Sequence, residues 1–338
     1  MNKLRSVAGI VVIALGIWAL IGIFGSSTNL AEARQWTSSK QCQECHQEVY
    51  SEWVDSWHAQ SWVDEDVRHQ SNDFSKKDCI DCHAPRPVFE SGIGNRVLPR
   101  ASRRHEGVDC ISCHLLPSGE VAGSIDNPSA PCRPTIRREL QRTDFCAVCH
   151  DQHKTVQQWL TTSYVDKKQD CLHCHMPFRD GDPNRGRDHT MIGGHDIDLV
   201  RSAVELRGEA ADGVWKIEVE NVAAGHHYPT DERSRASDVF WRPLAEGAEE
   251  GEGRWYFLYR IRDPYRFETD LPRTLIAHGE TREIVLDHPD AKGGAEVGLF
   301  YNLRPVYVDR VTAETLPIED VLDPRPDAQL VHRVLLRP

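Results

Sequence analysis

The order of apolar and polar residues divides the chain into three stretches. The first contains one uninterrupted apolar run, from Val7 to Gly25. The second, residues 36–196, sustains no alternation, and its short apolar clusters predict short helices joined by long loops. From about Leu199 onward, apolar residues recur at every second position, which is typical of half-buried strands.

The last stretch predicts five strands separated by turns that are rich in Gly, Asp and Pro. They lie at residues 214–222, 254–262, 281–287, 295–308 and 331–336. In the first of them Lys216, Glu218 and Glu220 alternate with apolar residues. We therefore expect an α+β fold, in which a mostly helical domain with few regular elements (34–198) precedes an antiparallel β-sandwich-like domain (199–338).

Residues 1–33 have the features of a signal or anchor segment. Lys3 and Arg5 precede an apolar run of 19 residues, which is long enough to cross a bilayer as a helix. A cleavable signal peptide usually has a shorter apolar region, but Ala31-Glu32-Ala33 resembles a cleavage site. We expect the body to lie on the periplasmic side of the cytoplasmic membrane, anchored by this helix. The alternative is a soluble periplasmic protein, cleaved after Ala33.

The middle stretch contains the pattern C-x-x-C-H five times. The cysteines are Cys42, Cys45, Cys79, Cys82, Cys110, Cys113, Cys146, Cys149, Cys171 and Cys174. The histidines that follow are His46, His83, His114, His150 and His175. This is the attachment signature of c-type haem, because the two cysteines can form thioethers with one porphyrin and the histidine can bind its iron.

Zinc sites, thioredoxin-like motifs and disulfide frameworks fit this pattern less well. Zinc ribbons use C-x-x-C pairs two at a time, so an odd number is unexpected. A thioredoxin-like redox motif occurs once, near a βαβ pattern, and a disulfide framework needs no histidine. The sequence therefore predicts five covalently bound haem c groups, with the ten cysteines as attachment residues and the five histidines as iron ligands.

Five sites in residues 36–196 leave about 32 residues for each, too few to bury much apolar surface. We expect the porphyrins to form the core and the apoprotein to be largely unfolded. Four rings at helical spacing are expected to pack on haem: Tyr50, Trp53, Trp57 and Trp62.

The net charge of −12 argues against a nucleic-acid partner. Candidates for pairing with haem propionates, or else solvated charges, are Arg100, Arg103, Arg104, Arg137 and Arg138.

The second axial ligands must come from the 12 histidines that remain when the five motif histidines are subtracted from 17. Methionine occurs only three times, so ligation by two histidines is favoured over His/Met. Five histidines are suitably placed: His58, His105, His153, His189 and His195. His69 and His173 are weaker candidates. Cys132 lies outside every motif and is expected to be structural.

Three patterns together resemble multihaem cytochromes of the hydroxylamine-oxidoreductase-related class, which includes the small tetrahaem electron carriers of ammonia oxidisers. They are C-x-x-C-H-x-x-x-Y-x-x-W-x-x-S-x-H-A (42–59), H-E-G-V-D-C-I-S-C-H (105–114) and H-T-M-I-G-G-H-D (189–196). The resemblance covers about half of the chain. It implies a mostly helical domain, haems stacked in close pairs, and distal histidines at His58, His105, His189 and His195. This chain departs from the tetrahaem carriers in its five sites and its long carboxy-terminal extension, and it has no C-x-x-C-K site.

One loop of the predicted β domain, G-H-H-Y-P-T (225–230), contains two adjacent histidines. Similar loops accompany β extensions of multihaem cytochromes, so the resemblance implies that this loop folds back onto the haem domain. His226 or His227 would then reach an iron or a propionate. A plain surface loop is the alternative.

Two functions remain open. An electron-transfer protein needs closely spaced haems with saturated irons, and it exchanges electrons with donor and acceptor cytochromes or a quinol-oxidising complex. An oxidoreductase acting on a small nitrogen or sulfur compound needs one iron with an open position. The balance of five motifs and five distal candidates favours electron transfer, and no catalytic residue is predicted.

Overall fold

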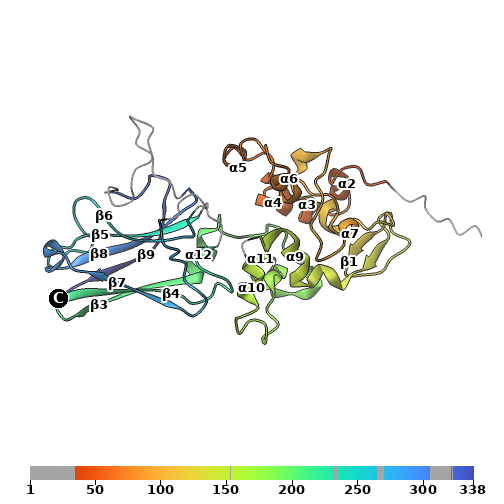
Figure 1. Ribbon diagram of the computed structural model, residues 1–338. Helices are drawn as coiled ribbons and strands as arrows, with labels where there is room; N and C mark the ends of the chain where they lie inside the picture. Colours follow the sequence, from red (N-terminus) through yellow and green to blue (C-terminus); the bar gives the residue numbers. More distant parts are fainter. Residues whose placement is uncertain (1–34, 153, 231–234, 265–269, 305–320, 322) are drawn as a thin grey trace, which may run out of the picture.

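The computed structural model describes residues 35–152, 154–230, 235–264, 270–304, 321 and 323–338. They form two parts that lie side by side, a helical part and a β part (Figure 1). The helices come mostly before residue 204, and the two larger sheets come after it. The α+β fold class predicted from the sequence is therefore confirmed.

The helical part consists of short helices joined by loops, and no described helix is longer than eight residues. In chain order they are α2 (Lys40–Gln43), α3 (Gln47–Val54), α4 (Trp57–Gln60), α5 (Glu65–Gln70), α6 (Lys77–His83), α7 (Val88–Ser91), α8 (Cys110–His114), α9 (Thr143–His150), α10 (Thr155–Trp159), α11 (Cys171–His175) and α12 (Ile197–Ala203). Two three-residue strands, β1 (Val121–Gly123) and β2 (Pro134–Ile136), pair in parallel. This small sheet was not predicted, because neither strand is long enough to show an alternating pattern.

Four of the five motifs lie entirely within helices, namely α6, α8, α9 and α11. A helix places residues three apart on one face, so both cysteines of a motif point the same way. Two of these helices start at an aspartate that accepts a backbone hydrogen bond: Asp109 from Ser112 N at 2.8 Å and Asp170 from His173 N at 3.2 Å. The first motif begins in α2 and ends at His46, which caps α3.

The β part contains two antiparallel sheets, with strand orders β3-β4-β7 and β6-β5-β8-β9. The strands are β3 (Val204–Ala211), β4 (Val214–Asn221), β5 (Ala236–Pro243), β6 (Tyr256–Ile261), β7 (Thr281–Leu286), β8 (Ala295–Asn302) and β9 (Gln329–Leu336). The sequence predicted β4, β6, β7, β8 and β9 but neither β3 nor β5. It also extended the fourth predicted strand to residue 308, whereas β8 ends at Asn302 and residues 305–308 lie outside the described chain.

The main hydrophobic core lies between the two sheets. In β4, Trp215, Ile217 and Val219 point into it, while the residues between them are more exposed. Nineteen buried residues from α12, both sheets and the segments that connect their strands form one cluster, whereas a cluster in the helical part contains three: Val88, Val97 and Phe145. The helical part therefore has little core of its own side chains, as expected for a domain built around bound groups.

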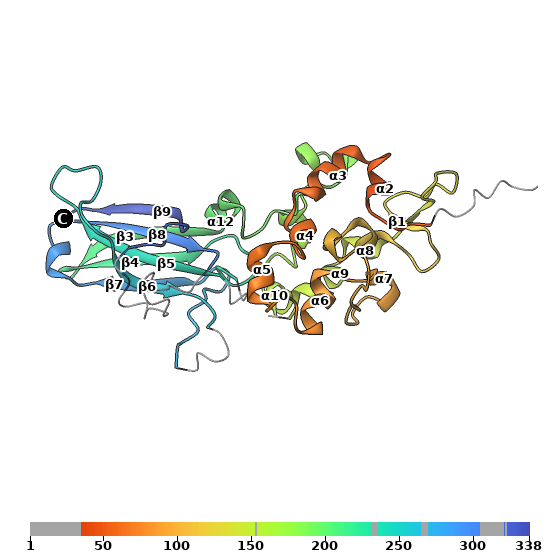
Figure 2. The ribbon, with the colours of Figure 1, turned by 90° about the horizontal axis from the view of Figure 1, so that it is seen from above.

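The two parts meet where α5 and α10 approach the β part, while α2 and β1 lie at the far end in both views (Figures 1 and 2). Arg304, just after β8, donates from Nε to Asp66 of α5 at 2.9 Å. The loop after β4 contacts α10 and the turn that follows it, where Tyr164 donates to the carbonyl of Ala223 at 2.9 Å.

Among the described residues, no helix has the length and apolar character needed to cross a bilayer. The apolar run Val7–Gly25, which the sequence predicts to be an anchor or signal, lies outside the described part of the chain.

Candidate functional site

The attachment helices lie next to one another in space. The thiols of Cys42 and Cys110 lie close enough together for each to shift the pKa of the other, which brings the first and third motifs together. Cys82 and Cys149 make the same contact between the second and fourth motifs. Cys146 and Cys171 join the fourth and fifth. All eleven cysteines are free of disulfides, so every motif cysteine is available for a thioether.

Three motif histidines each face a second histidine from a distant part of the chain. The ring centres of His114 and His189 are 6.3 Å apart, and those of His58 and His150 are 6.0 Å apart. His175 of the fifth motif faces His226 of the β part at 6.4 Å, with 13° between the ring planes.

These spacings fit one iron between each pair of rings. Two imidazole nitrogens about 2 Å from one metal ion, each with its ring centre about 1 Å behind it, set the ring centres roughly 6 Å apart. The pairs are too far apart for direct ring stacking, and each contains one histidine from a C-x-x-C-H motif. The residues present therefore fit a haem with two histidine ligands at the third, fourth and fifth motifs.

Backbone carbonyls fix the orientation of several of these rings. Nδ1 of His83, His114 and His175 donates to the carbonyls of Ser61, Ala122 and Ile192 at 2.8, 2.8 and 2.7 Å. A proton held on Nδ1 leaves the lone pair on Nε2, the nitrogen that would bind iron. Nδ1 of His189 donates to the carbonyl of Arg187 in the same way, at 2.8 Å.

Burial keeps four of the paired histidines, His58, His114, His150 and His189, neutral, which is the form that binds a metal. Burial, followed by the neighbouring His150 and His175, lowers the pKa of His58 to about 3. Burial and then His114 lower the pKa of His189 to about 4. The pKa values of His114 and His150 are also lowered, mainly by burial.

Gly107 and Glu52 hold two of the paired histidines, His58 and His189, in place. A Cβ on Gly107 (φ +59°) would lie 2.4 Å from the carbonyl oxygen of His58, so only glycine allows this close approach. Glu52 accepts a hydrogen bond from the backbone N of His189 at 2.9 Å and pairs with Arg179 at 2.5 Å. Burial alone would raise the pKa of Glu52, but Arg179 and the His189 N–H outweigh it and lower that pKa.

The other predicted ligands are placed differently. Among the described residues, no histidine ring faces His46 or His83 at this spacing. His105 is exposed, next to Glu106, whose carboxylate accepts from Ser38 and Ser39 just before the first motif. His153 lies outside the described residues. Iron ligation at His46, His83, His105 and His153 stays a prediction.

His195 lies apart from the motif histidines. Its ring stacks on Trp57 at 3.5 Å, and its Nε2 accepts from Arg235 at 3.0 Å. Burial and the positive charge of Arg235 lower the pKa of His195 to about 4. The ligand role that the resemblance implies for His195 stays a prediction.

Two of the arginines expected to be available for propionates are already paired within the protein. Arg100 is buried and lies 3.0 Å from Asp109. Arg103 pairs with both Asp109 and Glu106, at 2.6 and 2.7 Å. Arg104 lies over the ring of Trp62 at 5.3 Å. Arg100 and Arg103 therefore fix the start of α8, and Glu106 links Arg103 to the residues just before the first motif.

Comparison with known proteins gives a family match for part of the chain. Residues 41–115, which contain the first three motifs, match the family "Cytochrome c554 and c-prime". A search of curated proteins gave no match. The findings support a multihaem c-type cytochrome.

One solved structure resembles most of the chain. It is a penta-heme cytochrome c552 from Thermochromatium tepidum, with a TM-score of 0.61 and 18% sequence identity over 88% of this chain and 98% of that one. At this identity the likeness shows the fold alone. A superoxide reductase in the oxidised state also matches, at 14% identity over 30% of this chain and 79% of that one. Its TM-score of 0.17 is too low to support any inference.

The partners of the motif histidines in the three ring pairs could be predicted only in part. The sequence indicated His58 and His189, and it left His226 as one of two possibilities in the β loop. It could not pair them with motif histidines. The signal for His226 was the loop 225–230 itself, and the choice between His226 and His227 needed the structure.

Proposed function

We propose that this chain is a pentahaem c-type cytochrome that transfers electrons through closely packed haems with two histidine ligands each. The observation that carries the proposal is the set of three histidine pairs, each of which joins a motif histidine to a second one at the spacing of a single ion. Haem iron, when bound, takes up and releases one electron. Two histidine ligands saturate the iron and favour electron transfer over binding of a substrate.

The positions of the attachment residues support close spacing of the five sites. Thiol contacts link the first motif to the third, the second to the fourth, and the fourth to the fifth. Cys113 of the third motif lies close enough to Cys146 and Cys149 of the fourth for its charge to raise their pKa values. All five sites thus belong to one connected chain of neighbours.

The proposal places the chain in the hydroxylamine-oxidoreductase-related class. The three sequence patterns at 42–59, 105–114 and 189–196 support this, as do the paired attachment sites. Its partners are then redox proteins on the periplasmic side of the membrane, such as donor and acceptor cytochromes or a quinol-oxidising complex. The acidic net charge of −12 gives no support for nucleic acid as a partner.

The apolar run Val7–Gly25 supports export, with the chain anchored to the cytoplasmic membrane. A soluble periplasmic protein cleaved after Ala33 is the alternative. Amino-terminal sequencing of the haem-carrying protein distinguishes the two: an uncleaved start supports the anchor, and a start at Arg34 contradicts it.

A second candidate function rests on the surroundings of His83. No described histidine faces this ring, and its neighbour at 5.4 Å is the ring of Phe74, which cannot bind iron. An iron at the second motif with an open position would suit an oxidoreductase that acts on a small nitrogen or sulfur compound.

The mature protein is expected to carry five haems by mass spectrometry, and these should survive extraction with acidic acetone. It should take up five electrons in a reductive titration, one for each motif. A variant with Cys79→Ser and Cys82→Ser should lose one haem and one electron. Fewer than five haems in correctly matured protein, or steady consumption of hydroxylamine or nitrite, would contradict the proposal.

A further inference from the structure

We propose that His226, which belongs to the β part, is the second axial ligand of the iron at the fifth motif, so that the β part completes a haem site of the helical part. This inference rests on the proposed function, because it requires a haem on Cys171 and Cys174. It assigns to the β part a direct role in the redox chain rather than a separate docking role.

The geometry of the ring pair is the first support. The rings of His175 and His226 are 6.4 Å apart, close to the 6.3 and 6.0 Å of the two pairs that lie wholly within the helical part. The planes of His175 and His226 are also the most nearly parallel of the three pairs, at 13°.

In both rings Nδ1 is the nitrogen that is bonded to a backbone carbonyl. Nδ1 of His175 donates to the carbonyl of Ile192 at 2.7 Å, and Nδ1 of His226 donates to the carbonyl of His227 at 3.0 Å. These bonds fix the tautomer in which Nε2 carries the lone pair. The proximal histidines at the second and third motifs are held by the same kind of bond.

Within the β part, residues before and after His226 in the chain fix the loop that carries it. Asn221, the buried last residue of β4, donates to the carbonyls of His226 and Ile276 at 2.9 and 3.1 Å. Tyr228 is buried, its backbone pairs with Ile276, and its hydroxyl accepts from Ser237 at 2.8 Å. His226 therefore lies between two fixed points of the β core, so little conformational freedom remains to be lost when it binds a metal.

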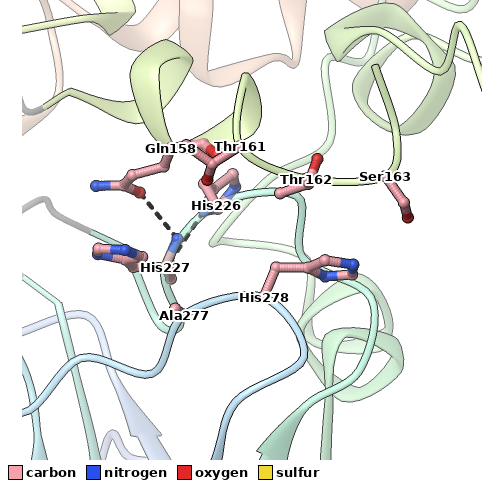
Figure 3. Close-up of a pocket in the computed structure, with 8 residues that line it drawn as sticks. All are labelled: Gln158, Thr161, Thr162, Ser163, His226, His227, Ala277 and His278. Carbon is pink, nitrogen blue, oxygen red and sulfur yellow. Dashed lines mark hydrogen bonds between the residues drawn. The ribbon is translucent and has the colours of Figure 1, made fainter. Parts of the chain in front are cut away.

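The helical part holds the same loop from the opposite side. Gln158 of α10 accepts from the backbone N of His227 at 2.9 Å (Figure 3). Gly225 lets the loop approach closely, since a Cβ there would lie 3.1 Å from the Tyr164 ring and 3.2 Å from the Trp159 ring. Trp159 in turn donates to the carbonyl of Gln169, just before the fifth motif, at 3.0 Å.

The two neighbouring histidines point elsewhere. Nδ1 of His227 lies 3.5 Å from an Arg273 nitrogen, on the side of the β part. The ring of His278 packs against Tyr164 at 4.9 Å, and its Nδ1 donates to the carbonyl of Ala224. Figure 3 shows His226, His227 and His278 pointing in different directions around a cavity of about 190 Å³ that all three line. This cavity leaves room for a small ligand next to the position of the His226 ring.

The test uses the full-length haem-loaded protein with His226→Gly, and His227→Ala as the matched control. Both variants should still carry all five haems by mass. His226→Gly should lose one fifth of the low-spin signal in electron paramagnetic resonance and gain a high-spin signal. Added imidazole should restore the low-spin state, and cyanide should bind one equivalent. His227→Ala should remain like the wild type.

A second variant guards against misfolding. His226→Met keeps a ligand that binds iron, so the haem should stay low-spin while its reduction potential rises relative to the other four. The inference is overturned if His226→Gly and His226→Met each carry five haems with unchanged spin states and potentials. Wild-type protein with no haem on Cys171 and Cys174 would overturn the proposed function together with this inference.

Discussion

Protein that matures without haem is expected to lose the helical part and keep the β part folded. The β part has nineteen buried residues in its main cluster, whereas the described cluster in the helical part has three. No described helix exceeds eight residues, and helices this short do not persist without tertiary packing. The bound groups must therefore supply most of the packing for residues 36–196.

The experiment replaces the ten motif cysteines by serine and subjects the variant to limited proteolysis. A resistant fragment is expected to begin near α12, because Val200 belongs to the β core and Arg201 donates to the Leu330 carbonyl of β9. Circular dichroism should show the loss of helix with the sheet signal retained. The haem-loaded protein is the control and should resist cleavage in both parts. A serine variant whose helical part is protected to the same extent would contradict this prediction.

Replacing Asp109 with alanine is expected to lower the free energy of unfolding of the haem-loaded protein by about 3–5 kcal/mol, the range found when a buried ion pair loses one partner. The Asp109 side chain is fully buried and pairs with Arg100 and Arg103 at 3.0 and 2.6 Å. It also caps α8, so its loss leaves Arg100 without its buried countercharge and the third attachment helix without its cap. Denaturant unfolding measures the change.

A surface pair provides the matched control. Arg142 and Asp144 have side chains that are 61% and 40% exposed, so Asp144→Ala should cost less than about 1 kcal/mol. An Asp109→Ala variant that loses no more stability than Asp144→Ala would contradict the structural role of Asp109.

The pKa of the Asp109 carboxyl group predicts how the free energy of unfolding depends on pH. Burial alone would raise the pKa of Asp109, but Arg100, Ser112 and Arg103 outweigh it and hold that pKa below its usual range. A carboxylate with a depressed folded-state pKa contributes stability that is complete above its unfolded pKa, about 4, and is lost as the pH falls toward the folded value. The wild type should therefore lose more stability below pH 4 than Asp109→Ala does.

The sequence predicted strands where alternation was clear and missed them where charge or small residues hid it. In β4 the alternation of Trp215, Ile217 and Val219 with charged residues led to a correct prediction. In β5 the buried Asp238 breaks the apolar pattern, and its burial is made tolerable by an ion pair with Arg260 at 2.7 Å and a hydrogen bond from Asn302 at 3.0 Å. Small residues hid β3, whose Gly208 leaves no room for a Cβ beneath Leu336.

The candidate site divides in a similar way. The motif cysteines and histidines could be read directly, because one helical turn fixes their geometry. The pairing of His58 with His150, or of His114 with His189, could not be read, because it depends on tertiary packing between distant segments. The direction of His226 depends on the anchors at Asn221 and Tyr228, which have no local pattern.

Low-temperature electron paramagnetic resonance of the oxidised protein, recorded with and without nitrite or cyanide, tests the central claim most directly. An electron carrier whose irons all have two protein ligands should show only low-spin haems, with spectra that do not change on adding either anion. The three histidine pairs predict this for the third, fourth and fifth motifs. A high-spin signal in the wild-type protein that shifts when nitrite is added would contradict electron transfer through saturated irons and indicate catalysis at an open one.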